Sequence, residues 1–226
     1  MIFPLGALVN GLAIGVGGGL GLLMGARLPE HTRTLVFQAL GLCVVVIGVQ
    51  AALQGTRPVA GIGALVAGCI LGEALRLEER CNALGERLKA RLNLGNPTFT
   101  QGLVNASVIF CIGAMGILGS LDEGLRGSRD VLLAKAVIDG FIAMMLAARY
   151  GVGVLFSGVP VFLYQGVLTM GAASLHDWLT PPLVAELTSV GGVIILGIGL
   201  NMLELTRIRL ANMIPALPLV PLFLLF

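Results

Sequence analysis

Two ionisable residues, Lys135 and Asp139, lie inside the long apolar run 131–150. They are four residues apart, the spacing that brings two side chains together on one face of a helix. If the run crosses a membrane, such groups are costly there and by default mark an ion or solute pathway. Lys135 has a second interpretation, in which its long side chain reaches back to the membrane surface. The pattern predicts a polar site on this run, with Asp139 as its main candidate.

Asparagines interrupt two further apolar runs, and both follow the same dipeptide. Leu8-Val9-Asn10 recurs as Leu103-Val104-Asn105, and the similarity continues in register through the following glycine and aliphatic positions. An amide in hydrocarbon needs hydrogen-bond partners. Asn10 and Asn105 therefore either bond to each other between two copies of a repeat or act as two ligands in a shared cavity. Other polar candidates for a pathway are Gln38, Gln50 and Asn201, and Ser107 and Gln165 are further polar residues inside apolar runs.

Motifs for enzyme chemistry or metal binding do not accompany these residues. The two histidines, His31 and His176, fall in separate loops, and the four cysteines form no Cys-x-x-Cys pair. The glycine run at 15–21 lacks the Lys-Ser/Thr that follows it in a phosphate-binding loop. We expect no catalytic residue, no metal and no cofactor.

The composition predicts a protein that is embedded in a lipid bilayer. Hydrophobic residues make up 57% of the 226 residues, charged residues 12%, and the mean hydropathy is +0.98. A soluble domain carries about 25% charged residues, so this chain has too few polar groups to cover a water-exposed surface. The net charge of +2, without a basic tract, gives no support to nucleic-acid binding.

Seven apolar runs are each long enough for a helix that crosses the hydrocarbon core. An eighth run, 208–226, contains three prolines, which leaves it open between a broken span, a re-entrant piece and an interfacial tail. The fold class predicted is all-α, a polytopic membrane helix bundle that forms one transmembrane domain over 1–226. The seven runs are 3–25, 34–53, 59–75, 100–119, 131–150, 152–170 and 183–205.

The repeated asparagine block predicts an inverted three-helix repeat. One copy covers about 3–76 and the other about 99–172, and 183–226 adds C-terminal helices. Three spans separate the starts of the copies, so the copies run in opposite directions, as in many transporters. The runs at 42–50 and 193–201 are also alike, and this likeness permits a second alignment of the repeat.

A polar stretch at 73–96 predicts a surface amphipathic helix that continues the third span. Its apolar residues recur every three or four positions. Loops on this side of the membrane carry ten Lys and Arg residues against four on the other side, which places 73–96 in the cytoplasm and the N-terminus outside.

Small residues four apart allow close packing of helices in lipid. The first run has two sets with this spacing, Gly11/Gly15/Gly19 and Gly17/Gly21/Gly25, and Gly68 and Gly72 in the third run have it too. A flexible segment that lines a pathway is the second interpretation of these glycines. A thin, glycine-rich bundle has packing faces to spare, so we also expect a homo-oligomer, most simply a homodimer.

The chain resembles a known family, most specifically in its N-terminal block. The residues that carry the resemblance are Gly6-Ala-Leu-Val-Asn10, the glycine run, Gly25-Ala-Arg-Leu-Pro-Glu30 and Gln38-Ala-Leu-Gly-Leu42. By them the chain resembles the YdfK/YqgA-like family of bacterial inner-membrane proteins, domain of unknown function 554, over its whole length. The resemblance implies a bacterial plasma-membrane location and a role in transport, and it brings no substrate or catalytic residue with it.

Two functions fit these patterns. One is a transporter or channel for a small solute or ion, with its pathway at the interface of the two inverted copies. Its expected consequence is that Asn10→Leu, Asn105→Leu and Asp139→Ala abolish flux in a protein that still folds. The other is a membrane scaffold or partner-binding subunit that transports nothing, in which the glycines and asparagines serve packing.

Overall fold

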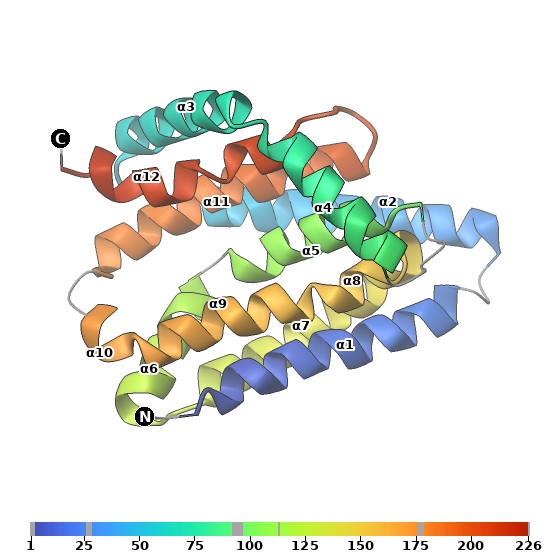
Figure 1. Cartoon of the computed structure of the whole chain (residues 1–226), viewed down its shortest axis with the longest axis horizontal. Helices are drawn as coiled ribbons and strands as arrows, with labels where there is room; N and C mark the ends of the chain where they lie inside the picture. Colours follow the sequence, from blue (N-terminus) through green and yellow to red (C-terminus); the bar gives the residue numbers. More distant parts are fainter. Residues whose placement is uncertain (1–2, 26–28, 92–96, 113, 176–178, 226) are drawn as a thin grey trace. The chain divides into compact units, whose positions relative to one another are not determined.

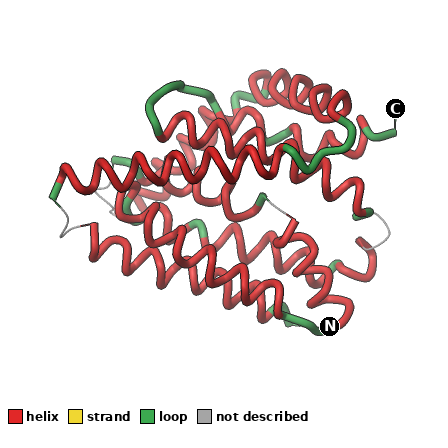
Figure 2. Tube along the Cα trace, turned by 180° about the vertical axis from the view of Figure 1, so that it is seen from behind, coloured by secondary structure: helices red, strands yellow, loops and turns green. Residues whose placement is uncertain are grey.

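The computed structural model describes residues 3–25, 29–91, 97–112, 114–175 and 179–225, and every regular element within them is a helix (Figures 1 and 2). The predicted all-α class is confirmed. The elements are α1 Leu5–Gly25, α2 Glu30–Ala52, α3 Pro58–Ala74, α4 Leu77–Arg91, α5 Phe99–Cys111, α6 Ala114–Arg126, α7 Asp130–Tyr150, α8 Gly153–Phe156, α9 Gly158–Met170, α10 Ala172–Leu175, α11 Pro181–Met202, η1 Leu210–Met213 and α12 Ala216–Phe223.

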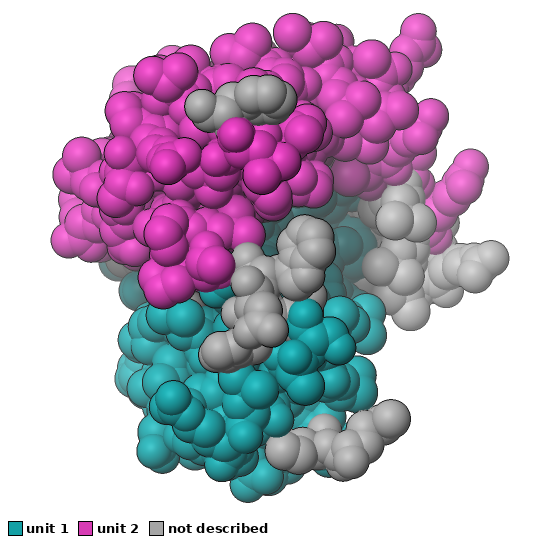
Figure 3. Space-filling view, turned by 90° about the vertical axis from the view of Figure 1, so that its left-hand side faces the viewer, with its two compact units in different colours: residues 1–37, 89–179 teal, residues 38–88, 180–226 magenta. Residues whose placement is uncertain are grey.

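The chain forms two compact units, each built from two separate stretches of sequence (Figure 3). Unit 1 consists of residues 1–37 and 89–179, and unit 2 of residues 38–88 and 180–226. Unit 1 therefore holds α1 and α5 to α10. Unit 2 holds α3, α11, η1 and α12 with most of α2 and α4.

In unit 1, α1 packs along α7 through glycines. A Cβ atom on Gly17 would collide with the carbonyl oxygen of Gly140, and one on Gly21 with that of Met144. From the first of these contacts to the second, the residue number rises by four in both helices, so the two helices run parallel. Such contact between backbones is possible only where side chains are absent.

The two predicted glycine sets of α1 differ in what they contact, and Gly17 and Gly21 belong to the set that packs on α7. Gly11 approaches the Gly158 carbonyl of α9 at 3.0 Å, measured from an ideal Cβ position. The corresponding positions at Gly15 and Gly19 have none of the described atoms within 4 Å. The spacing of four fits both glycine sets in this helix, and only the structure shows which set makes the contact with α7.

The fourth predicted span, 100–119, is a broken helix in the structure. Its two parts, α5 and α6, meet at 61° across a break of a few residues. In the sixth predicted span, 152–170, α8 and α9 together make an 18-residue segment, Gly153–Met170, that can cross a membrane.

In unit 2, glycines again mark the close contacts. Gly68 lies against the backbone of Ala216 at the start of α12, and Gly72 lies against the carbonyl of Asn212 in η1. Gly48 of α2 and Gly192 of α11 bring these two helices into similar contact. α3 continues into α4 with a bend of 55°, at Leu75 and Arg76, and Arg76 has a positive φ of 50°.

Four of the described helical segments are long and apolar enough to cross a membrane, and six if each bent pair counts as one span. The sequence predicted seven such spans. The additional one is 34–53, where the structure has only a shorter apolar helix, Gly41–Ala52. The start of α2 is polar, with Glu30, His31 and Thr32 in its first turn. The eighth run is broken into η1 and α12, and Leu210–Phe223 is likewise too short to count as a long span.

The outer face of the helices is apolar. In α1, Leu12, Val16, Leu20 and Leu23 are between 51% and 65% exposed, and they recur every three or four residues. α9 exposes Val159, Leu163 and Val167 in the same way, while its Gln165 is fully buried. A bundle with aliphatic side chains outside and polar ones inside is suited to lipid rather than to water.

Candidate functional site

The buried ion pair of α7 is the centre of the candidate site. The Lys135 ammonium donates to Asp139 Oδ2, and the two residues are 6% and 4% exposed. Lys135 also donates from Nζ to the carbonyl oxygen of Phe110, at 2.9 Å. The side chain of Lys135 therefore points into unit 1 and does not reach out to the surface, which was the second interpretation of its sequence position.

The broken helix explains why Lys135 finds a backbone acceptor there. Phe110 is the last residue but one of α5, and the last four carbonyls of a helix have no partner within it. A carbonyl at a helix C-terminus also carries the negative end of the helix dipole, which favours a nearby cation. The α5 terminus thus stabilises Lys135 on one side, and Asp139 does so on the other.

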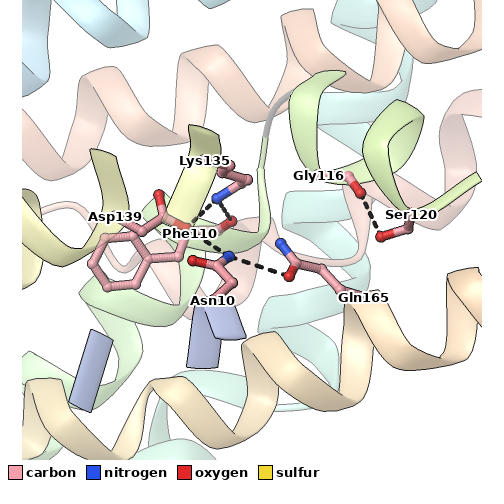
Figure 4. Close-up of polar contacts among 7 residues, drawn as sticks. All are labelled: Asn10, Phe110, Gly116, Ser120, Lys135, Asp139 and Gln165. Carbon is pink, nitrogen blue, oxygen red and sulfur yellow. Dashed lines mark hydrogen bonds and ion pairs between the residues drawn. The ribbon is translucent and has the colours of Figure 1, made fainter. Parts of the chain in front are cut away.

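Two amide side chains complete the site (Figure 4). Asn10 of α1 donates from Nδ2 to Asp139 Oδ2 at 2.9 Å and to Gln165 Oε1 of α9 at 3.1 Å. Asn10 and Gln165 are both fully buried. Among the described residues, Asn10 Oδ1 and Gln165 Nε2 have no hydrogen-bond partner. The site thus presents one free acceptor and one free donor in a water-poor interior.

The orientation of both amides follows from the carboxylate. An ionised carboxylate only accepts hydrogen bonds, so the NH₂ group of Asn10 must face Asp139. Its second hydrogen then points at Gln165, whose oxygen must face Asn10. Turning either amide over would place like groups against each other. Asn10 Oδ1 and Gln165 Nε2 are therefore directed away from the ion pair.

A glycine on α6 borders this donor. A Cβ atom built on Gly116 would lie 3.7 Å from Gln165 Nε2 and 3.5 Å from Lys135 Cε, which are ordinary contact distances. Ser120, one turn further along α6, donates back to the Gly116 carbonyl at 2.7 Å (Figure 4). There is room for a methyl-sized group beside Gly116, and the helix after the break forms one wall of the site.

The other residues predicted for the pathway lie apart from this cluster. Asn105 donates from Nδ2 to the Tyr150 hydroxyl at 3.3 Å, so it pairs with α7 and not with Asn10. Gln38 and Gln50 are exposed on α2. Asn201 donates to the Ile208 carbonyl and accepts from the Ile208 N–H, which folds the turn after α11. The cluster thus combines three predicted residues, Asn10, Lys135 and Asp139, with Gln165.

A separate surface groove of about 510 Å³ lies in unit 2. None of the predicted pathway residues lines it. It is bordered by Arg57, Pro58, Val59, Ala60 and Phe223.

Two fully buried carboxylates were missed by the sequence analysis. Glu123 of α6 accepts from the backbone N–H of Gly6 at 2.8 Å, and Glu186 of α11 accepts from those of Thr56 and Arg57 at 2.5 Å. Glu123 therefore binds an N–H group in the first turn of α1, and Glu186 binds the N–H groups of the two residues directly before α3. A signal for Glu186 was available, since it is a lone acidic residue in an apolar run. Glu123 follows Asp122 near the end of an apolar run and resembles an ordinary loop residue.

His176, Asp177 and Arg27 lie outside the described residues, as does the end of the predicted amphipathic stretch, 92–96.

The long apolar helices, the lipid-suited outer faces and the polar interior define a polytopic α-helical membrane protein. The chain belongs to the family described as protein of unknown function DUF554, whose model matches residues 5–225. The resemblance inferred from the sequence is thereby confirmed.

Two relatives align over nearly the whole chain. "Uncharacterized protein YqgA" of Escherichia coli (strain K12) is 31% identical over 218 residues, which cover 94% of this chain and 93% of the relative. "Uncharacterized membrane protein YdfK" of Bacillus subtilis (strain 168) is 29% identical over 220 residues, with 96% and 93% covered. No solved structure matches this chain.

Proposed function

We propose that the protein carries a small polar solute across the membrane and that the solute binds at Asn10, Lys135, Asp139 and Gln165. The observation that supports this most is the pair of unpartnered amide atoms, Asn10 Oδ1 and Gln165 Nε2, in a fully buried position. Leaving a polar atom unpaired in the interior costs about 1–3 kcal/mol. A bound solute that offers one donor and one acceptor would offset that cost.

The charge of the site favours a neutral or zwitterionic solute. Lys135 and Asp139 carry opposite charges and are in contact, so together they add no net charge. A bare ion would gain little from such a pair and would lose its hydration shell. A neutral molecule or a zwitterion with hydrogen-bonding groups loses less on entering the site.

The broken helix beside the site also fits transport. Transporters place solute sites at discontinuous helices near the membrane midplane, where freed backbone groups contribute to binding. Irregular backbone at that depth is tolerated where it faces protein or a water-filled cavity. α6, which follows the break, contributes Gly116 to the site.

A second function has its own support. Lys135 and Asp139 neutralise each other's charge without a solute. The backbones of α1 and α7 are also in very close contact at Gly17 and Gly21. A packed unit of this kind would suit a membrane scaffold that moves no solute. In that case the unpaired amide atoms would be a tolerated cost of packing.

The finer assignments belong to the same proposal. We place the protein in a bacterial inner membrane, with α4 on the cytoplasmic side because the Lys and Arg residues are unevenly distributed between alternate loops. We also propose a homodimer, because glycine-rich helices leave close-packing faces for a second copy. The two inverted copies at 3–76 and 99–172 remain part of this proposal.

Uptake into liposomes tests the transport function. Purified protein is reconstituted and supplied with radiolabelled urea, glycerol, glycine and glycine betaine, and with sodium, potassium and chloride as ion probes. We expect uptake of at least one of the uncharged or zwitterionic probes. Asn10→Leu and Gln165→Leu each remove a solute-binding group worth about 1–3 kcal/mol, which lowers uptake by about fivefold to a hundredfold.

Gln101→Leu is the matched control, because Gln101 is a glutamine on α5 of the same unit but is exposed. It should transport like wild type. Equal uptake by wild type, Asn10→Leu and Gln165→Leu would show that the solute passes elsewhere. Absence of uptake for every probe in the folded wild type would favour the scaffold.

A further inference from the structure

Glu123 is a buried carboxylate that is only half satisfied. Its Oε1 accepts from the Gly6 N–H at 2.8 Å and from Arg129 Nε at 3.0 Å. Its Oε2 has no hydrogen-bond partner among the described residues, and the side chain is fully buried. A bare carboxylate oxygen in an apolar interior is costly, and a bound proton removes that cost.

The charged side chains around Glu123 come from α6 itself and from the start of α7. Within the described chain, α1, α9 and α10 bring no charged side chain to it, and Thr169 of α9 and Ala172 of α10 lie beside the neighbouring Gly124. Leu132 of α7 and Oε2 of Glu123 both lie close to Gly6. The charged groups nearby are Arg129 and Asp130 at the start of α7, and the Asp122–Arg126 pair on α6 itself.

Glu123 joins two of the three helices that carry the solute site, α1 and α7. Gly6 is one turn before Asn10 on α1, a rise of about 6 Å. Arg129 is the residue directly before α7, which carries Lys135 and Asp139. One carboxylate therefore holds the start of α1 and the start of α7 to α6, and α6 also contributes Gly116 to the site.

We propose that Glu123 is a proton-binding site whose protonation is coupled to passage of the solute, so that transport is driven by a proton gradient. This rests on the proposed transport function. A proton from water adds to Oε2 of the carboxylate, and the product is a neutral carboxyl group. No electron is transferred and no other bond is broken. The ion pair with Arg129 is lost, and the starts of α1 and α7 are released from α6.

Access for the proton is provided by Arg129. Its side chain is 41% exposed while that of Glu123 is not exposed at all. The Arg129 side chain thus separates the Glu123 carboxylate from the surface on this side, and movement of that side chain uncovers the carboxylate. A site that is buried in one state and reached in another is what coupling to a gradient requires.

Infrared spectroscopy of the protein in lipid tests proton binding directly. The C=O stretching band of protonated carboxyl groups is recorded as the sample is brought from neutral to acidic pH. We expect a component in wild type that Glu123→Gln lacks and that Asp122→Asn retains. The amide introduced by Glu123→Gln keeps an oxygen for the Gly6 N–H, and a thermal melt checks that the variant is folded. Identical spectra from wild type and Glu123→Gln would overturn the proposal.

Uptake in liposomes tests the coupling. With the probe that wild type transports, we expect an inward proton gradient to raise wild-type uptake and to have no effect on Glu123→Gln. Glu186→Gln is the matched control, since Glu186 is equally buried and also binds a helix start, but in unit 2. It should respond to the gradient like wild type.

The two measurements separate the two proposals. Wild-type uptake that ignores the proton gradient would overturn the coupling and leave transport standing. If wild type takes up no probe, the transport function fails, and the infrared result alone decides whether Glu123 binds a proton.

Discussion

Asp139→Ala is expected to destabilise the protein by about 3–5 kcal/mol, the usual cost of removing one partner from a buried ion pair. The substitution leaves the Lys135 ammonium 6% exposed beside the Phe110 carbonyl, with no counter-charge. It also removes the acceptor that orients Asn10. The fraction of folded protein measured against denaturant in detergent micelles would show the loss.

The double variant Lys135→Met/Asp139→Leu is the control for that loss. Two apolar side chains of similar volume leave no buried charge behind, and such replacements are often neutral or stabilising. We expect it to be close to wild type in stability. An Asp139→Ala variant as stable as wild type would mean that the two side chains do not form a buried pair.

Gly21→Leu is expected to have the other large effect. A side chain there meets the backbone carbonyl of Met144, which cannot move without bending α7. Overpacking of this kind costs about 3 kcal/mol at the upper end of its usual range. The midpoint of thermal unfolding in detergent should fall clearly.

Gly19→Leu is the matched control for Gly21→Leu. Gly19 is on the same helix, and no described atom lies within 4 Å of its Cβ position. It should unfold like wild type or slightly later, because leucine favours a helix more than glycine does. If both variants unfold at the same temperature, α1 does not pack on α7 through Gly21.

Much of the candidate site was accessible from sequence because charge in an apolar run is a strong signal. Lys135 and Asp139 were identified as a pair by their spacing, and the structure brings them together. Gln165 was noted only as a polar residue in an apolar run, because its role depends on where α9 packs. Asp139→Ala, favoured from sequence as a test of flux, is unsuitable in view of the buried charge that it leaves.

The break between α5 and α6 could not be predicted from the periodicity of the sequence. The run 100–119 has no proline and reads as one continuous span. The carbonyl of Phe110 instead binds Lys135, which is 25 residues away in sequence. A helix end that is stabilised by a distant side chain leaves no local pattern to detect.

The likeness of Asn10 and Asn105 does not extend to their surroundings. Asn10 binds a carboxylate and an amide, and Asn105 binds a tyrosine hydroxyl. A different similarity links α1 with α3. A buried glutamate accepts a hydrogen bond from the Gly6 N–H at the start of α1 and from the Arg57 N–H directly before α3. In both cases the glycines of closest contact follow eleven and fifteen residues later, as Gly17 and Gly21 in α1 and as Gly68 and Gly72 in α3. This similarity is not visible in the apolar sequence, because only the contacts between helices show which glycines are equivalent.

Uptake by the double variant Lys135→Met/Asp139→Leu tests the transport site most directly. The variant keeps the volume of the pair, so a loss of uptake cannot be attributed to a buried unpaired charge. It removes the carboxylate that directs the Asn10 amide, and with it the arrangement that leaves Asn10 Oδ1 and Gln165 Nε2 free to bind solute. We predict a folded protein in liposomes with uptake reduced to the level of protein-free vesicles. Wild-type uptake by this folded variant would contradict the assignment of the site.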